Sequence, residues 1–256
     1  MDLFFGIGGT GALIFAFCVS LFAGLVKGVV GFAVPTILVS GLGTVASAEV
    51  AVAGMIMSAL ATNGWQALRQ GVGAALESVR KFKVFLVAGF VLMMICTQLV
   101  PLVPGQVLLL LIGVLITLFV SLQIAGIQLR IPGHPGVRMQ AAFGGVAGAM
   151  GGLSGIWGPP TVAMLTAMET EKKEQIRIQG VIYGLGSVAL VAGHLGSGVL
   201  RSETLPLSLA LVPAAVLGMA IGFRIQDRID QASFRKATLA VLLIGGLNLI
   251  RRGMMG

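Results

Sequence analysis

Two short stretches contain the residues that are best suited to bind a ligand. The first, GLVKGVVGFAVP (24–35), places Lys27 among glycines and aliphatic residues, more than twenty positions from the nearest acidic residue. The second, LSGIWGPP (153–160), has a similar glycine spacing, with Ser154 in the place of Lys27. A lysine near the centre of a bilayer costs about 2.5–3.5 kcal/mol even on a lenient insertion scale, so it is normally functional. The missing partner of this cation is predicted to be an anionic substrate.

The two stretches align with each other as the signature of an internal repeat. VKGVVG (26–31) matches LSGIWG (153–158), and PTIL (35–38) matches PTVA (160–163) after a slip of two residues. Interrupted apolar segments at corresponding places in two halves of a chain often mark the binding site of a transporter.

Each interruption is predicted to end one helix and start another. A restarting helix presents unpaired N–H groups and the positive end of its dipole, which suits an oxyanion. Prolines are favoured in a first helical turn, as at Pro35, Pro159 and Pro160. The alternative for the glycines is close helix packing, and the alternative for Lys27 is snorkelling to an interface. The predicted substrate-binding residues are Lys27, Gly28, Gly31, Thr36, Ser154, Gly155, Trp157, Gly158 and Thr161.

Other polar residues in the apolar segments have more ordinary interpretations. Helix–helix hydrogen bonds are expected for Asn63, Gln66, Gln179 and Tyr183, and packing for Cys18, Cys96 and His194, although His194 could also carry a proton. All nine acidic residues lie in loops or at segment ends, which gives no support to a carboxylate proton relay or sodium site. We expect no metal and no cofactor.

The composition indicates an all-α, polytopic membrane protein. The 256 residues are 57% hydrophobic and 10% charged, and the apolar runs are continuous rather than alternating, which is unlike a β-barrel. The net charge of +8 comes from basic residues between the apolar segments, so it indicates membrane topology and not nucleic-acid binding. The start of the chain has no basic n-region, so no cleaved signal peptide is expected.

Eight apolar stretches divide the chain into two sets of four. A first repeat (1–126) and a second repeat (140–256) flank a basic cytoplasmic linker (127–139). The first stretch of each set is long, and its break is expected to divide it into halves of about 13 residues, or ~20 Å, which would reach the middle of a bilayer. The stretches are 11–40, 47–67, 84–103, 105–126, 140–168, 178–199, 206–223 and 237–250.

Loop charges favour re-entrant hairpins for the two broken segments. With hairpins, thirteen Lys and Arg residues share the cytoplasmic side, and three (Arg201, Arg251 and Arg252) lie opposite. Full crossings would divide them nine to seven, a poorer fit to the positive-inside rule. Three full crossings per half is an odd number, so the repeats are predicted to be inverted, with both termini outside. The two hairpin tips would then meet near the midplane.

The whole chain resembles the TauE/SafE, or sulfite exporter, family of membrane transporters. The most specific stretch is GAMGGLSGIWGPPTVAMLTAM (148–168), with a glycine-rich turn followed by Gly-Pro-Pro, whereas KGVVGFAVP in the first half departs from the commoner glycine cluster. The resemblance implies export or uptake of small sulfur-containing or organic anions, such as sulfite, sulfoacetate and other sulfonates.

We therefore predict a multi-pass exporter of such an anion in the bacterial inner membrane. An inside-negative potential drives anions outward, so export needs no coupling ion. Uptake by cation symport is the alternative within transport. No catalytic motif supports an enzyme, and a structural subunit would tolerate replacement of Lys27. The expected partners are a small anion and the lipid bilayer, and no nucleic acid is expected. The chain could also form a homodimer.

Overall fold

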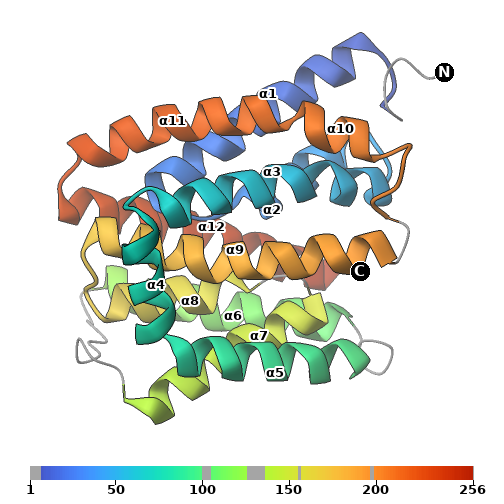
Figure 1. The fold of residues 1–256 in the computed structure, drawn as a ribbon. Helices are drawn as coiled ribbons and strands as arrows, with labels where there is room; N and C mark the ends of the chain where they lie inside the picture. Colours follow the sequence, from blue (N-terminus) through green and yellow to red (C-terminus); the bar gives the residue numbers. More distant parts are fainter. Residues whose placement is uncertain (1–6, 100–104, 126–135, 155–156, 197–198, 256) are drawn as a thin grey trace. The chain divides into compact units, whose positions relative to one another are not determined.

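The computed structural model describes residues 7–99, 105–125, 136–154, 157–196 and 199–255, and within these residues the regular elements are all helices (Figure 1). Two compact units divide the chain. Unit 1 contains Met1–Ala75 and Ile176–Asp230, and unit 2 contains Leu76–Gln175 and Gln231–Gly256. Each unit therefore combines segments from both predicted repeats.

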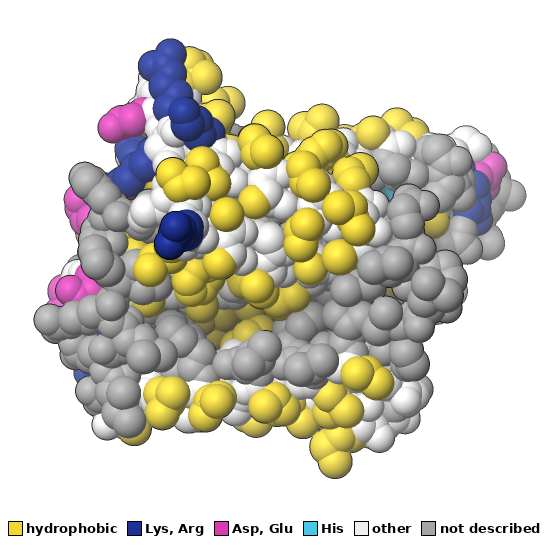
Figure 2. Space-filling model, turned by 90° about the horizontal axis from the view of Figure 1, so that it is seen from below, with side chains coloured by type: hydrophobic (Ala, Val, Ile, Leu, Met, Phe, Trp, Pro, Cys, Tyr) yellow, Lys and Arg dark blue, Asp and Glu magenta, His cyan; other side chains and the backbone are white. Residues whose placement is uncertain are grey.

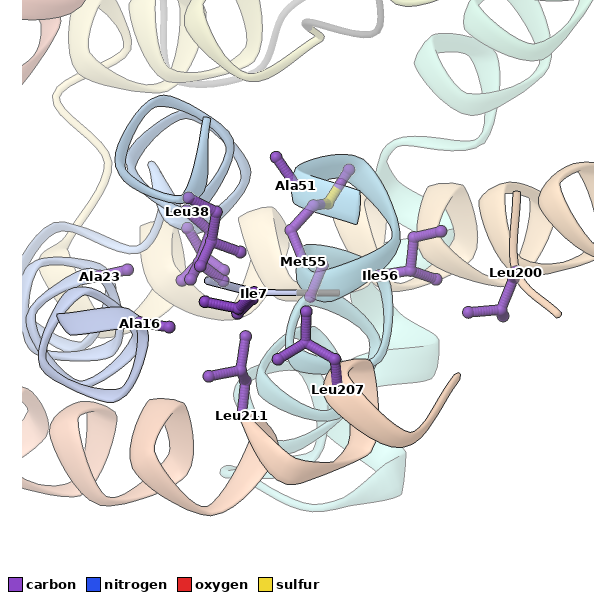
Figure 3. Packing of buried hydrophobic residues seen from close by; sticks show 13 residues of the cluster. Ile7, Ala16, Ala23, Leu38, Ala51, Met55, Ile56, Leu200, Leu207 and Leu211 are labelled. Carbon is purple, nitrogen blue, oxygen red and sulfur yellow. The ribbon is translucent and has the colours of Figure 1, made fainter. Parts of the chain in front are cut away.

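Unit 1 is built around an apolar core to which four of its helices contribute (Figure 3). Leu38 and Leu42 are fully buried together with Leu207 and Leu211, and Ile56 lies in the same cluster. The helices of this unit are α1 (Thr10–Val30), α2 (Val34–Leu42), α3 (Ala48–Leu68), most of α9 (Lys172–Gly196), α10 (Leu205–Ala210) and α11 (Val212–Arg228). The boundary between the units falls within α9 and within α4 (Val72–Lys81).

Unit 2 contains the second broken segment and the last helix of the chain. Its complete helices are α5 (Lys83–Leu99), α6 (Gly105–Ile124), α7 (Val137–Ser154), α8 (Gly158–Ala167) and α12 (Gln231–Met255). Many large apolar side chains of α5 are exposed, among them Val87 and Phe90. Hydrophobic side chains spread over the face shown in Figure 2, and most charged side chains in that view lie at its left edge. Such a surface suits a lipid environment.

The predicted helical segments and the two predicted interruptions are present, with two differences. The loop 68–83 contains α4, a short helix with an exposed Val72 and Leu76 and two basic residues in its last turn, which had not been predicted. The equal division of the broken segments is wrong. Helix α1 has 21 residues and α2 has nine, whereas α7 has 18 and α8 has 10. At 1.5 Å per residue, the long arms reach about 27–32 Å and the short arms about 14–15 Å.

Four helical stretches in the described residues are long and apolar enough to cross a membrane. They are Thr10–Val30, Lys172–Ala192, Leu205–Arg228 and Gln231–Met255, and Lys83–Cys96 is a shorter apolar helix. The break in the first segment comes at the end of one of these long helices. Since α2 turns back and places Gly41 against Val19 of α1, the two helices form an antiparallel hairpin with unequal arms.

Glycines allow α1 and α11 to pack backbone against backbone. A Cβ added at Gly28 would lie 2.8 Å from the Cα of Gly222, and one at Gly218 would meet the carbonyl oxygen of Leu21. The contacts advance in the same direction along both helices, so the pair is parallel (Figure 1). Gly24 and Gly28 thus face two glycines of α11 with the same spacing of four, an arrangement common where membrane helices approach closely.

Helices α5 and α7 in unit 2 pack in the same way. Gly144 lies against the backbone of Phe85, and Gly148 lies against Gly89, so this pair is also parallel. By contrast, α6 and α12 run antiparallel, because Gly113 of α6 meets Gly246 while Leu110 meets Gly253. Each unit therefore contains one close parallel pair that includes a broken segment's long arm.

The α1–α11 contact leads to a first prediction. Gly222→Ala should lower the free energy of unfolding by about 1–3 kcal/mol, because the new methyl group meets backbone atoms of Leu25 and Gly28, which cannot move aside as a side chain can. Gly64→Ala on α3 is the control, since a Cβ there has nothing within 4 Å, and alanine should stabilise that helix by up to about 1 kcal/mol. Thermal unfolding in detergent measures both. Equal melting temperatures for the two variants would contradict this packing.

Candidate functional site

The break in unit 1 consists of three residues, two of which have a left-handed backbone conformation. Helix α1 ends at Gly31, which has φ +88° and donates its N–H to the carbonyl of Lys27 at 2.6 Å. Ala33, which precedes α2, has φ +86°. Glycine adopts this conformation freely, but for alanine it costs about 1–2 kcal/mol. The left-handed conformations at Gly31 and Ala33 reverse the chain within one short turn, and the strain at Ala33 marks this turn as a candidate functional element.

Two glutamine side chains satisfy the carbonyl groups that the break leaves open. Gln66 of α3 donates from Nε2 to the carbonyl of Gly31 at 3.0 Å and to that of Ile176 at 2.6 Å. In the amide orientation that satisfies both of its atoms, Gln179 of α9 donates to Val30 at 3.2 Å and to Gly31 at 3.0 Å. A Cβ at position 31 would collide with the Gln179 amide, so only glycine fits here.

Lys27 lies one turn before the break and is 1% exposed. Its ammonium group donates to Oδ1 of Asn63 on α3, and it lies 5.8 Å from the ring centroid of Tyr183 on α9. Asn63 in turn donates from Nδ2 to Ser187 Oγ at 2.7 Å and to the carbonyl of Tyr183 at 3.2 Å. A side chain this buried does not snorkel, which removes the alternative interpretation of Lys27.

Lys27 has a hydrogen-bond partner within unit 1, Asn63, which the sequence indicated only as a residue of a helix–helix hydrogen bond. The partner is a neutral amide, however, and the ion pairs among the described residues do not include Lys27. The sequence did not show this contact because Lys27 and Asn63 are 36 positions apart in the chain. Within the described part of the chain, this ammonium group meets an amide oxygen and an aromatic ring, and neither supplies a balancing negative charge.

The break in unit 1 lies beside the end of α3. The prediction had placed it near the middle of the membrane, and therefore near the middle of the neighbouring helices. Gln66, which bonds to Gly31, is only two residues from Leu68, the last residue of α3. Arg69 follows at once and pairs with Asp227 at 2.6 Å, and Arg177 bonds to Gln70 at 2.7 Å. Relative to α3, the first break is thus within one turn of a charged end of unit 1, because α1 is longer than the predicted half-segment.

The break in unit 2 lies between Ser154 and Gly158. Helix α8 starts after Trp157 without a side-chain cap, and prolines occupy its first turn. The Trp157 ring packs on α7, where a Cβ at Gly151 would be 3.1 Å from it. Thr161 is fully buried and donates to the carbonyl of Trp157 at 3.2 Å. Gly155 and the side chain of Ser154 lie outside the described residues.

The remaining predicted residues differ in whether their surroundings fit ligand binding or close helix packing. Gly28 packs against Gly222, as the close-packing alternative requires, and a ligand role for it stays a prediction. Thr36 lies half-buried in the first turn of α2, a helix that also starts without a side-chain cap. Both α2 and α8 start without a side-chain cap, but Pro159 and Pro160 leave the first turn of α8 with few N–H groups. The first turn of α2, with one proline, is thus the better N-terminus for an anion.

Sequence reasoning assigned the polar residues of α3 and α9 to helix–helix bonds and missed that they surround the break. Asn63 and Gln66 are three residues apart, and Gln179, Tyr183 and Ser187 are each four apart. These spacings place each set on one face of a helix, which was the available signal. Together they form a buried polar cluster around Lys27 and Gly31, which we call the α3–α9 cluster.

One protein family matches nearly the whole chain. The sequence profile described as Sulfite exporter TauE/SafE matches residues 16–249, a range that includes both breaks, the α3–α9 cluster and every predicted site residue. No curated protein and no solved structure gives a match.

The Lys27–Asn63 contact leads to a second prediction. Asn63→Leu should lower the free energy of unfolding by about 3 kcal/mol, because it leaves a buried ammonium group without its acceptor. The double variant Lys27→Met/Asn63→Leu should regain most of that loss, since both polar partners are gone. Thermal unfolding of the two single variants, the double variant and the wild type completes the cycle. A double variant as unstable as Asn63→Leu would show that the contact does not couple the two residues.

Proposed function

This chain belongs to the sulfite exporter TauE/SafE family, and on that premise we propose that it exports sulfite, sulfoacetate or a related organosulfonate across the bacterial inner membrane. Membership of this family and the four apolar helices identify the chain as a membrane transport protein. The observation that carries the choice of an anion is Lys27, a fully buried cation whose partner in unit 1 is a neutral amide.

An anion would supply the charge that Lys27 lacks. The ammonium group donates to Asn63, and on binding of a substrate it would turn from this amide to an oxygen of the anion. A hydrogen bond between an ammonium group and an anion is worth about 1.5–3 kcal/mol, more than one to a neutral amide. The uncapped N–H groups at the start of α2 and the half-buried Thr36 would complete this part of the site.

We further propose that the two halves of the chain are inverted repeats, each a re-entrant hairpin followed by three crossings. In such a repeat, α1, α3, α5 and α6 correspond to α7, α9, α11 and α12. The parallel pairs α1–α11 and α7–α5 are then equivalents of each other. The pairs α3–α9 and α6–α12 join corresponding helices, which must be antiparallel, and both pairs run so.

We propose that the second break, in unit 2, also binds the anion. Trp157, Gly158 and Thr161 at the start of α8, together with Ser154 and Gly155, are its proposed residues, with hydroxyl and indole donors that carry no charge. The first hairpin contributes a cation, Lys27, and the second contributes neutral donors.

The direction of transport follows from electrostatics. An inside-negative potential favours outward movement of an anion by about 2.3 kcal/mol per charge per 100 mV. Export then requires no coupled cation, whereas uptake of an oxyanion, the alternative, requires one. Dependence of flux on potential alone would separate the two directions.

A third prediction concerns topology. Single cysteines at Gly73, Gly136 and Lys173, all exposed, should react with a membrane-impermeant reagent only from the cytoplasmic side, and one at Ser202 only from outside. Gln175 is unsuitable as a probe because it is 2% exposed. Reaction of position 173 from outside while position 73 reacts from inside would rule out the second hairpin.

A fourth prediction tests the function itself. Proteoliposomes that contain the protein should move labelled sulfite or a sulfonate down the electrical gradient without sodium. Lys27→Ala should weaken substrate binding ten- to a hundredfold, Lys27→Arg should keep some binding with less selectivity, and Lys27→Glu should abolish transport. Lys173→Ala, an exposed lysine, is the control for loss of one positive charge.

Two outcomes would contradict the proposal. Unchanged affinity in Lys27→Ala, measured on folded protein, would mean that Lys27 does not bind the anion. A strict requirement for a sodium or proton gradient at zero potential would favour symport, and would direct attention to His194, whose Nδ1 is buried without a partner in the described structure.

A further inference from the structure

Unit 2 contains a polar pocket whose lining includes no residue of either break. Its volume is about 460 Å³, and it lies where α8 ends and where α9 and α12 begin. The first turns of two helices therefore border it, and their positive ends favour a negative ligand. The pocket is lined by Thr166, Glu169, Thr170, Gln175, Gln231, Ala232, Phe234, Arg235 and Thr238.

Arg235 is the cation of this pocket, and its contacts leave room for another acceptor. It donates from one terminal nitrogen to Gln123 Oε1 at 2.6 Å, which fixes the guanidinium plane. Its other terminal nitrogen lies 3.7 Å from Glu169 Oε1, which is beyond hydrogen-bond distance. The side chains of Arg235 and Glu169 are 27% and 47% exposed, so water reaches both groups.

Glu169 occupies a position that normally favours glycine. It follows the last turn of α8 with φ +52°, and the N–H groups of Glu169 and Thr170 bond back to the carbonyls of Thr166 and Leu165, both at 3.1 Å. This is the Schellman arrangement, in which a left-handed residue ends a helix. The chain thus holds a carboxylate next to Arg235 at the expense of backbone strain, and this carboxylate occupies the place of an anion.

Two buried threonine hydroxyls in the pocket wall have no hydrogen-bond partner. Thr238 is fully buried and Thr166 is 5% exposed, and the Oγ1 atoms of both are unpaired in the described structure. Helical threonines commonly bond to a carbonyl of the preceding turn, as Thr62 does with Ser58 at 2.6 Å. An unpaired buried hydroxyl is destabilising, and a rotation about χ1 would bring each hydroxyl to a ligand oxygen in the adjoining pocket.

We propose that this pocket, the Arg235 pocket, is a second oxyanion site, which binds a small anion with a tetrahedral or pyramidal XO₃ or XO₄ group. The guanidinium would hold two of the anion's oxygens, as its planar fork favours, and the two threonine hydroxyls would donate to the oxygens that face the wall. The anion would displace Glu169 from Arg235. Binding at this site depends neither on Lys27 nor on transport.

Calorimetric titration of the detergent-purified protein with sodium sulfate and with sodium ethanesulfonate tests the proposal, against potassium chloride at equal ionic strength. The titrations use wild-type protein and Lys27→Ala, so that binding at the breaks and in the Arg235 pocket can be separated. In the Lys27→Ala background, Arg235→Gln should lose affinity at least thirtyfold, and Arg252→Gln, an exposed arginine at the other end of α12, should leave it unchanged.

Two further variants keep Arg235 and therefore test the pocket even if Arg235→Gln does not fold. Thr238→Val should raise the melting temperature of the anion-free protein, because an unpaired buried hydroxyl is removed, and should weaken sulfate binding three- to tenfold. Glu169→Gln should strengthen binding three- to tenfold, because the competing carboxylate is gone. A merely structural role for these residues would change stability without changing affinity.

The proposal is overturned if sulfate and ethanesulfonate affinities in the Lys27→Ala background are the same in Thr238→Val, Glu169→Gln and the unsubstituted pocket. Binding that disappears in Lys27→Ala alone would also overturn it, and would leave the function proposed for the breaks intact. Failure of flux with normal binding in the Arg235 pocket would contradict the transport proposal and leave this one standing.

Discussion

Backbone polar groups in an apolar environment must find a hydrogen-bond partner, and in unit 1 the arrangement around the first break depends on this constraint. When α1 ends at Gly31, the carbonyls of Val30 and Gly31 lose their helical donors, and the amides of Gln66 and Gln179 replace them. The two glutamines come from α3 and α9, so the same bonds that satisfy the break also join three helices. The break is consequently an ordered element, and Lys27 one turn earlier is presented in a defined position.

The same cluster explains how a buried lysine is tolerated without a counter-ion. Asn63 accepts from Lys27 and is itself oriented by bonds to Ser187 and to the backbone of Tyr183, whose ring also faces the ammonium group. A carboxylate in place of Asn63 would balance the charge permanently and would compete with any anionic ligand. A neutral amide holds the lysine in place and leaves its charge uncompensated, which is the property that the proposed transport function requires.

Close approach of helices is the second constraint, and it explains much of the glycine content. Glycines of α1 and α11 meet backbone to backbone in unit 1, and those of α5 and α7 do so in unit 2. Lipid provides no hydrophobic drive for helix association, so close van der Waals contact has to supply it. Gly28 lies near the proposed site and also packs against α11. At position 31 a glycine is needed for a different reason, because φ is positive there and the amides of two glutamines leave no room for a Cβ.

The helical class, the apolar segments, the two interruptions and the unusual position of Lys27 could all be predicted from the amino-acid sequence. These features depend on local hydropathy, glycine and proline, all of which act over a few residues. The folded chain was needed to find that Asn63 bonds to Lys27, that two distant glutamines satisfy the break, and that the break lies near one end of α3 rather than at its middle. Thr166 of α8 likewise meets Arg235 and Thr238 of α12 only in the folded chain. The physical reason is that hydrogen bonds between helices depend on which faces meet, and helix packing sets those faces over distances in sequence that local patterns do not cover.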